Sequence, residues 1–318
     1  MPTSVKPQLS QFALDVAEGL SRNQKKLAPR YFYDDLGAAL FEAITLLPEY
    51  GLTRADERLI SLHAPKIVCE TGAVWEIAEL GSGTGKKTRR ILEAFSELNG
   101  LTAYRPIDVS SAALAHCERE LSTLARVQPI CGDWMEGLAT AVRSRRSDRP
   151  LLLLFLGSSI GNLDRESMVS FLRQLRSHLR PADFFLLGAD LVKDIDIMRA
   201  AYDDATGVTA AFNLNLLGRM NRELAANFEL SSFAHEVRWN SGSRRIEMHL
   251  RSRSDQTVCI EALEASFAFH AGETIWTESS HKFTEAELDS YAYSSGFAPV
   301  HMWTDQEWPF AEALWQAV

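Results

Sequence analysis

The stretch WEIAELGSGTGKKT, residues 75–88, decides the fold of this chain. A mostly apolar run ends near an acidic residue, turns through Gly81, Gly83 and Gly85, and enters a segment of helix-forming composition. Glycine tolerates positive φ and has no Cβ, so the backbone of such a turn can approach a ligand closely. The helix that follows would present free N–H groups to that ligand. The stretch therefore predicts a strand, a nucleotide-type loop and a helix.

Three known loops compete for this stretch. A phosphate-binding P-loop that begins at Gly81 would require glycine at the position of Lys86. A dinucleotide loop, G-x-G-x-x-G, fits Gly81 and Gly83 but also requires glycine at Lys86. The remaining pattern, E-x-G-x-G-x-G, is typical of class I methyltransferases, which bind S-adenosylmethionine there. Taken alone, the stretch is also compatible with a tight strand–helix turn that binds nothing.

Composition limits the classes of function. With 318 residues, 46% of them hydrophobic and 24% charged, the chain is an ordinary soluble globular protein with room for a substantial core. Its net charge of −9 argues against a nucleic-acid partner, which would need a basic patch. The longest apolar run, residues 151–156, is far too short to span a bilayer, so we expect no membrane partner.

Cysteine usage and the N-terminus bear on the compartment. The cysteines lie far apart in the sequence, at Cys69, Cys117, Cys131 and Cys259. They predict neither a zinc site nor a disulfide framework, and free thiols suit a reducing cytoplasm. No signal peptide is expected, because Asp15 and Glu18 interrupt the first apolar stretch. We therefore expect a cytoplasmic protein without a metal.

Residues 74–190 alternate between strand-like and helix-like segments, which predicts a parallel, doubly wound sheet. The expected strands are 74–80, 101–108, 127–131, 150–156 and 183–189. The expected fold class is thus α/β, the Rossmann-like sheet of class I methyltransferases, with a second, smaller α+β substrate-binding domain.

The rest of the chain interrupts this alternation. Residues 7–28 have apolar residues at helical intervals and are expected to form one amphipathic helix. Residues 257–269 are expected to form one strand, and residues 300–305 the last strand of the chain. The expected domains are an N-terminal helical and aromatic segment that contributes to the substrate domain (1–60), the S-adenosylmethionine-binding core (61–195), an inserted substrate-binding domain (196–285) and a C-terminal return to the core sheet (286–318).

Polar residues follow successive strands of the predicted sheet, at the edge where open α/β sheets bind ligands. Asp108, after the second strand, is well placed to accept two ribose hydroxyls. Asp133, after the third, could accept from an adenine amino group, with Trp134 against the ring. A helix cap or a solvated turn is the alternative for each aspartate, and NAD also remains possible on these residues alone. Their joint occurrence at successive strand ends is the stronger argument for a cofactor.

More specific motifs occur along nearly the whole chain. They are YFYD (31–34), LPEY (47–50), ELGSGT (79–84), IDVS (107–110), FLGS (155–158), IGNL (160–163), DLVKD (190–194), residues 202–213, Glu247-Met248 and ESSHKF (278–283). In these motifs the chain resembles the histidine-specific Nα-methyltransferases of ergothioneine biosynthesis. That family makes hercynine, the Nα-trimethyl betaine of histidine. The resemblance implies S-adenosyl-L-methionine as the cofactor, L-histidine as the small-molecule substrate, and S-adenosyl-L-homocysteine as the second product.

The resemblance also implies which residues form the site. The expected cofactor-binding residues are Gly81, Ser82, Gly83, Lys87, Asp108, Asp133 and Trp134. The expected substrate-binding residues are Tyr50, Gly157, Asn162, Tyr202, Met248, Glu278 and Ser280. The expected catalytic residues, next to the reacting amine, are Tyr33, Asn162 and Tyr202. Glu278 and Ser280 would bind the imidazole, while Tyr50, Asn162 and Tyr202 would hold the amino-acid end.

The chemistry of these residues agrees with such roles. Glu278 and Ser280 are two positions apart on an extended segment, so their side chains point the same way. A carboxylate can accept from one imidazole N–H, and a hydroxyl can serve the other ring nitrogen. The alternative for Glu278 is a surface carboxylate paired with Lys282, and for Met248 plain core packing. The aromatic residues ahead of the glycine loop could likewise be ordinary core or a lid over the substrate.

Some positions depart from the family pattern. Trp134 stands where phenylalanine is common, a change that should preserve adenine packing. After LPEY the family commonly continues Tyr-Pro-Thr-Arg, whereas this chain has Gly51-Leu52-Thr53-Arg54. Gly51 has no aromatic ring and Leu52 lacks the rigidity of proline, so the predicted lid is loosened.

The expected reaction is in-line transfer of a methyl group from the sulfonium to a neutral α-amine, which needs alignment within about 3–3.5 Å. The phenol ring of Tyr33 is expected to stabilise the methylammonium product by cation–π attraction. We expect a monomeric enzyme. The alternatives are an Nα-methyltransferase for tryptophan or a histidine derivative, a non-catalytic S-adenosylmethionine-binding partner protein and, more remotely, an NAD-dependent reductase.

Overall fold

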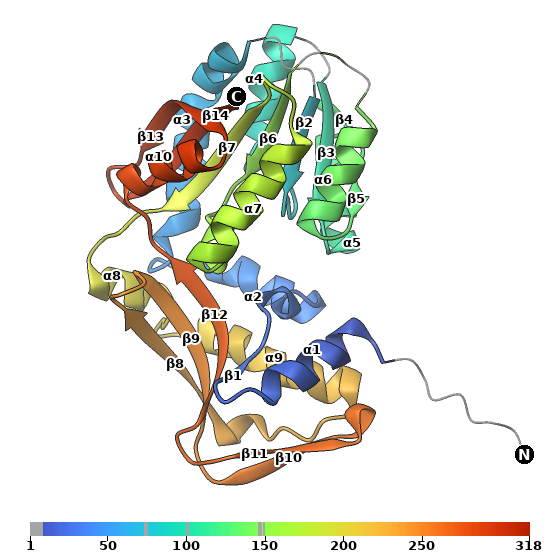
Figure 1. The fold of residues 1–318 in the computed structure, drawn as a ribbon, viewed down its shortest axis with the longest axis vertical. Coiled ribbons are helices and arrows are strands. Elements are labelled where there is room, and N and C mark those ends of the chain that lie inside the picture. The colour runs from blue at the N-terminus through green and yellow to red at the C-terminus, as the bar shows by residue number, and fades with distance from the viewer. Residues whose placement is uncertain (1–8, 73–75, 100–101, 146–147, 149) are drawn as a thin grey trace, which may run out of the picture. The chain divides into compact units, whose positions relative to one another are not determined.

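The computed structural model describes residues 9–72, 76–99, 102–145, 148 and 150–318 (Figure 1). The chain divides into two compact units, each formed by segments distant in the sequence. We call residues 51–193 and 281–318 the major unit, and residues 1–50 and 194–280 the minor unit. Residues 51–60, which the sequence-based division placed with the N-terminal segment, belong to the major unit because they open its first helix.

The major unit is built on an eight-stranded sheet in the order β13-β14-β7-β6-β2-β3-β4, with β5 paired to β3. Strands β2 to β7 pair in parallel, and β14 runs antiparallel to both β7 and β13. The bounds are β2 Glu76–Leu80, β3 Thr102–Asp108, β4 Ala125–Val127, β5 Ile130–Cys131, β6 Leu151–Phe155, β7 Phe184–Asp190, β13 Phe297–Thr304 and β14 Phe310–Ala317. The predicted α/β sheet is confirmed; parts of the first two expected strands, residues 74, 75 and 101, lie outside the described residues.

Helices lie on both faces of this sheet (Figure 1). They are α3 Gly51–Thr71, α4 Thr88–Asn99, α5 Ser111–Leu121, α6 Trp134–Arg143, α7 Arg165–His178 and α10 Glu285–Ser294, with a short 3-10 helix η2 at Ser159–Asn162. Every residue of β6 is buried, as expected of a strand covered on both faces, and Leu151, Leu153 and Phe155 belong to the hydrophobic core. This core holds the parallel strands in register, so that the residues after their carboxyl ends lie along one edge of the sheet.

Two expectations about strands in the major unit are wrong. The segment 127–131 forms two short strands, β4 and β5, rather than one. The segment 300–305 is not the last strand, because β14 follows β13 and inserts between β13 and β7. β14 is buried at almost every position and therefore lacks the alternation of a half-buried strand.

The minor unit has a four-stranded sheet in the order β1-β12-β9-β8 and a two-stranded hairpin, β10-β11. Its strands are β1 Lys25–Lys26, β8 Phe233–Asn240, β9 Arg245–Ser252, β10 Gln256–Ile260, β11 Ala265–Phe269 and β12 Thr274–His281. Its helices are α1 Gln11–Leu20, α2 Asp35–Thr45, α8 Ile195–Ala200 and α9 Val208–Leu224, with 3-10 helices η1 Pro29–Phe32, η3 Leu230–Ser232 and η4 Glu261–Leu263. The expected α+β character of this part is what the structure shows.

Two expectations in the minor unit are also wrong. The helix expected over 7–28 ends at Leu20, and Lys25–Lys26 pairs with β12 as a strand instead. Residues 257–269 form the hairpin β10-β11 rather than one strand. The chain reverses at η4, after which Glu264 adopts a left-handed φ of 50°. A distant strand therefore decides the conformation of residues 25–26, and a local reversal divides residues 257–269.

A buried ion pair stabilises the amino-terminal side of the major sheet. Arg145 donates through two nitrogens to the carboxylate of Asp183, at 2.9 and 2.8 Å, and both side chains are almost fully buried. The same carboxylate accepts from the backbone N–H of Leu151 and of Arg180, each at 2.8 Å. Asp183 therefore joins the start of β6 to the turn before β7.

We expect Asp183→Ala to lower the free energy of unfolding by about 3–5 kcal/mol, because it leaves the buried guanidinium of Arg145 without its carboxylate. Urea denaturation measures the change. The matched control is Asp148→Ala, since Asp148 is a fully exposed aspartate whose ion pair with Arg180 is long, at 3.7 Å. Equal effects of the two substitutions would contradict the role assigned to Asp183.

Candidate cofactor and substrate residues

The glycine loop follows β2 and has the backbone geometry that its sequence predicts. Gly81, Gly83 and Gly85 have φ values of 66°, 52° and 70°, in the left-handed region that favours glycine. The N–H of Gly81 donates to the carbonyl of Ile107 at 2.8 Å, and that of Gly83 donates to Asp108 Oδ2 at 2.9 Å. The loop is thus tied to the end of β3, at the carboxyl edge of the parallel strands.

The loop leaves one polar atom for a ligand. Ser82 Oγ is buried and has no hydrogen-bond partner among the residues that the structure describes. A buried hydroxyl without a partner costs about 1–3 kcal/mol. A ligand held by the loop would satisfy this hydroxyl, which fits the cofactor role expected of Ser82.

The two strand-end aspartates have different surroundings. Asp108 accepts from the N–H of Gly83 and, through Oδ1, from the N–H of Ser110 at 2.9 Å. Asp133 caps α6 by accepting from Met135 N and Glu136 N, so the helix-cap alternative holds for this residue. Its cap uses one oxygen, Oδ1, and the residue is exposed, so the cap does not preclude a contact with adenine.

Trp134 lies beside the glycine loop. A Cβ placed on Gly81 would be 3.4 Å from its indole Nε1. The indole packs edge-on against Phe155 and Phe171, with ring centroids 4.8 and 5.8 Å apart. The structure therefore brings Trp134 next to the loop, as its expected place against a cofactor ring requires.

Lys87 was expected to bind the cofactor and Gly157 the substrate. Both donate to the same carboxylate, that of Asp56, which was in neither expected set. Asp56 Oδ2 accepts from Lys87 Nζ at 2.5 Å and from the N–H of Gly157 at 2.9 Å. Gly157 has a φ of 71°, and a Cβ there would lie 3.0 Å from Lys87 Nζ. Asp56 lies on the buried face of α3 together with Leu52 and other apolar residues. An acidic residue on an apolar helix face is the signal that could have identified it.

Glu79, the acidic residue of the loop motif, is buried beneath the loop. Its Oε2 accepts from Thr88 Oγ1 at 2.6 Å and from the hydroxyl of Tyr104. Burial raises the pKa of Glu79 to about 7, against the lowering effect of these hydrogen bonds and of Lys87. Through these hydrogen bonds Glu79 joins the loop to β3 and α4.

In the minor unit, three of the expected substrate residues lie together. The hydroxyl of Tyr202 donates to Ser280 Oγ at 2.7 Å. The rings of Tyr50 and Tyr202 meet edge to face, with centroids 6.1 Å apart. Tyr50 lies in the turn after α2, Tyr202 follows α8, and Ser280 is on β12. Only tertiary packing brings them together.

Tyr33 belongs to an aromatic cluster in the same unit. Its ring meets Phe41 at 5.6 Å and Phe212 at 5.9 Å, both edge to face. Phe41 in turn meets Tyr50 at 6.5 Å. The aromatic residues ahead of the glycine loop are thus part of a packed core, and through Phe41 this core connects Tyr33 with Tyr50.

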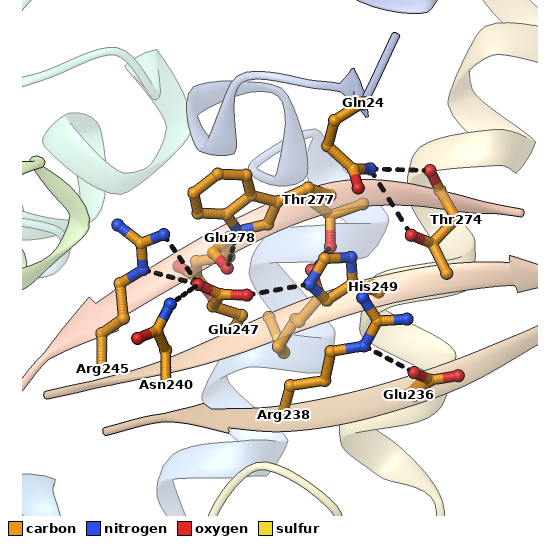
Figure 2. Close-up of polar contacts among 12 residues, drawn as sticks. Gln24, Glu236, Arg238, Asn240, Arg245, Glu247, His249, Thr274, Thr277 and Glu278 are labelled. Atoms are coloured by element: carbon orange, nitrogen blue, oxygen red, sulfur yellow. Dashed lines mark hydrogen bonds and ion pairs between the residues drawn. The ribbon is translucent and has the colours of Figure 1, made fainter. Parts of the chain in front are cut away.

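Figure 2 shows Glu278 on β12 in the neighbourhood of β9. The side chain of Glu278 is half-buried, and its carbonyl accepts from Trp276 Nε1 at 2.9 Å. Met248 is buried on β9, and its carbonyl accepts from Thr277 Oγ1 at 3.0 Å. Glu278 and Met248 therefore come from adjacent strands of one sheet.

The pairing of Glu278 with Lys282 stays an alternative, and Lys282 has an acidic partner in its own unit. Lys282 is fully buried and its Nζ donates to Asp190 Oδ2 at 2.8 Å in the major unit. Asp190 also accepts from Lys193 Nζ at 2.5 Å. Two lysines on one buried carboxylate lower its pKa, and burial lowers the pKa of Lys193 to about 8.

A second carboxylate, Glu247, anchors a polar network on β8 and β9 (Figure 2). Its Oε1 accepts from Arg245 Nε at 2.7 Å and from Asn240 Nδ2 at 3.1 Å. Its Oε2 lies 3.3 Å from His249 Nε2, and burial lowers the pKa of this histidine. The sequence marked Glu247 only as part of a motif; its partners were not predicted.

The other two expected substrate residues, Gly157 and Asn162, lie in the major unit after β6. Asn162 is the last residue of η2. The turn before it is fixed by Ser158, whose backbone has a left-handed φ of 58° and whose Oγ accepts from the N–H of Asp190 at 2.9 Å. A non-glycine residue in this region stores strain of about 1–3 kcal/mol, which is typical of functional turns.

Gly51, where the family pattern has an aromatic residue, lies against the indole of Trp308. A Cβ on Gly51 would lie 2.1 Å from Cε3 of Trp308, so the indole ring fills the space of a side chain at this position. Trp308 is held by its Nε1, which donates to Asp190 Oδ1 at 2.9 Å, and by Lys193 Nζ, 4.7 Å from its ring centre. The loss of a ring at position 51 is therefore accompanied by a tryptophan from a distant loop.

Comparison with known proteins identifies the family of the chain. Residues 12–317 match the family described as "Histidine-specific methyltransferase, SAM-dependent". The chain belongs to this family. It is 40% identical over 303 residues to the "Histidine N-alpha-methyltransferase" of Mycolicibacterium smegmatis, an alignment that covers 94% of this chain and 93% of the relative.

Two further relatives agree. The protein of the same name from Mycobacterium tuberculosis is 40% identical over 304 residues, with 94% of this chain and 93% of the relative covered. "Ergothioneine biosynthesis protein 1" of Neurospora crassa is 27% identical over 286 residues, which cover 88% of this chain and 32% of that protein. The family resemblance expected from the motifs is confirmed, and the dinucleotide-dependent reductase is excluded: the chain is an S-adenosylmethionine-dependent methyltransferase.

Two features are absent from the residues that the structure describes. None of their helices is long and apolar enough to cross a membrane. They also contain no group of three or more histidine, cysteine, aspartate or glutamate side chains placed to hold a metal ion.

We expect Gly51→Ala to lower the free energy of unfolding by about 1–3 kcal/mol, because the new methyl group overlaps the ring of Trp308. In a Trp308→Gly background the same substitution should cost much less, and a double-mutant cycle by urea denaturation measures this coupling. Gly132→Ala is the control, since a Cβ there meets nothing within 4 Å. Additive effects of the two substitutions would contradict the contact.

Proposed function

We propose that this enzyme transfers three methyl groups from S-adenosyl-L-methionine to the α-amino group of L-histidine, which forms hercynine in ergothioneine biosynthesis. The observation that carries the proposal is the family match over residues 12–317, together with relatives of nearly equal length that are named for this activity. The residues expected to bind histidine are all present in the chain.

The major unit fits the cofactor. Gly81, Ser82 and Gly83 would hold it through the loop backbone and the unpartnered hydroxyl of Ser82, with Lys87 close to the loop. Asp108 would accept from the ribose hydroxyls, and Asp133 and Trp134 would bind the adenine. When bound, the cofactor supplies an electrophilic methyl group on a sulfonium. The left-handed glycines leave the backbone bare on the side where a ligand approaches.

The residues next to the amine are proposed to hold the reacting nitrogen in place. An α-amine with a free pKa of about 8 must lose a proton before its lone pair can attack. The hydroxyl of Tyr202 donates to Ser280, and Tyr202 is proposed to hold the amino-acid end of the substrate. Tyr33 and Asn162 are proposed to orient the same nitrogen, and the ring of Tyr33 to stabilise its growing positive charge.

The imidazole is proposed to lie against Glu278 and Ser280. Ser280 accepts from Tyr202, and a hydroxyl can also serve an imidazole nitrogen. Glu278 then accepts from the N–H of the other ring nitrogen. An indole has a single N–H and no ring acceptor, so this pair of residues favours histidine over tryptophan.

We further propose that the enzyme acts in the cytoplasm as a monomer and without a metal, as its composition and cysteine usage suggest.

The decisive experiment incubates the purified protein with S-adenosylmethionine and the twenty amino acids pooled, and follows the products by mass spectrometry. We expect a gain of three methyl groups on histidine alone. Methylation of tryptophan instead would support the other amino-acid substrate, and cofactor binding without turnover would identify a non-catalytic partner protein. Either result overturns the proposal.

We expect Glu278→Gln to raise the Michaelis constant for histidine about 10- to 100-fold and that for S-adenosylmethionine far less. The reason is the loss of a charge-assisted hydrogen bond to the imidazole, worth about 1.5–3 kcal/mol. Steady-state kinetics with each substrate varied in turn measures both constants. The control is Glu261→Gln, at an exposed glutamate of η4. Equal increases in both constants for Glu278→Gln would contradict the assignment.

A further inference from the structure

The strongest unexplained feature of the molecule is a group of buried acidic side chains under the glycine loop. Asp56 on α3 is fully buried, and its Oδ2 accepts from both Lys87 and the N–H of Gly157. These two partners are 31 and 101 residues away from it in the sequence. One carboxylate oxygen thus connects the loop after β2 with the turn after β6.

The other side of Asp56 faces Glu312, a fully buried residue in the middle of β14. Asp56 Oδ1 and both carboxyl oxygens of Glu312 are buried, and no N–H or O–H group of the described residues donates to them. Two carboxyl groups that face each other form a hydrogen bond only when one of them holds a proton. A shared proton accounts for these unpartnered oxygens.

Neighbouring strands cover the carboxyl group of Glu312, so water does not reach it. Glu312 pairs with Gly188 of β7 and with Trp303 of β13 in the sheet. A Cβ on Gly188 would lie 3.0 Å from Glu312 Oε1 and 3.2 Å from the N–H nitrogen of Gly157. The absence of a side chain at Gly188 therefore leaves the space in which the Glu312 carboxyl group lies beside Gly157.

The charges lead to the same conclusion. The titratable groups that face Glu312 are Asp56 of α3, Glu79 of β2 and Lys87 of the loop before α4. Three buried carboxyl groups around one ammonium would bury excess negative charge, which is costly unless protons are retained. Burial first, then the charges of Asp56 and Glu79, hold the pKa of Glu312 well above its usual range, against the effect of Lys87.

We propose that Glu312 is a neutral carboxylic acid that donates its proton to Asp56 Oδ1, and that this pair positions Lys87 and the Gly157 amide for cofactor binding. Glu312 is a positioning residue, since it acts through Asp56. The neutral acid fixes the rotamer of Asp56, so that Oδ2 points at both donors. The inference rests on the proposed function only in assigning Lys87 and Gly157 to the site.

The first test uses Glu312→Gln, whose amide N–H replaces the acid O–H at nearly the same shape. We expect its affinity for S-adenosylmethionine, measured by calorimetry without any methyl acceptor, to stay within about twofold of wild type. Glu312→Leu, which has no donor, should weaken binding about tenfold or more. Equal weakening by Gln and Leu would show that Glu312 acts as a charged carboxylate and would overturn the proposal.

The second test is the dependence of thermal stability on pH. The folded state retains a Glu312 proton that the unfolded chain releases above about pH 4.3, so raising the pH destabilises the wild type. Glu312→Gln has no such proton. Its Tm relative to wild type should therefore rise steadily between about pH 5 and pH 8, with the exposed Glu307→Gln as a control that shows no trend. A Tm difference independent of pH would overturn the proposal even if Glu312→Leu fails to fold.

These measurements separate the two proposals. Histidine turnover tests the reaction, whereas cofactor affinity and the pH trend test Glu312 in an enzyme with any acceptor. A carboxylic-acid band in the infrared spectrum that disappears in Glu312→Gln provides a direct observation of the proton.

Discussion

The contact of the Asp56 carboxylate with Lys87 and the Gly157 amide is the constraint on which the cofactor side of this enzyme depends. It joins a helix that precedes the sheet to the two turns that follow β2 and β6. Because the contact is buried, its charges are weakly screened, and breaking it would leave an unpaired charge in the core. The glycine loop needs no bulky side chains to fix its position, because the ion pair of Lys87 with Asp56 holds it.

Strand direction positions the candidate cofactor residues, whereas side-chain packing positions the expected substrate residues of the minor unit. The parallel strands bring Gly81, Asp108 and Asp133 to one edge of the sheet, as strand direction requires. The substrate residues of the minor unit are held in another way. Tyr202 and Ser280 bind each other, and Tyr33 and Tyr50 belong to an aromatic core. Rings packed in this way lose little further freedom when a ligand binds, which favours affinity.

The backbone around the candidate cofactor residues could be predicted because it depends on local motifs. The alternating glycines predicted left-handed backbone, and the structure has it at each of them. The parallel strands were predictable from continuous apolar runs such as residues 151–155. The errors occurred where strand pairing decides the conformation: β1 was taken for helix, β14 was missed, and the hairpin β10-β11 was taken for one strand. In each case a partner strand, rather than the segment's own pattern, decides the conformation.

The sequence by itself determined the α/β fold, the cofactor and the family, because glycine spacing, apolar runs and short motifs are local properties of the chain. Only the tertiary structure decided that Lys282 binds Asp190, that Trp308 fills the space at Gly51, and that Glu312 faces Asp56. Each of these contacts joins residues from different elements. Their energies come from burial and from the low dielectric of the core, which exist only once the chain has folded.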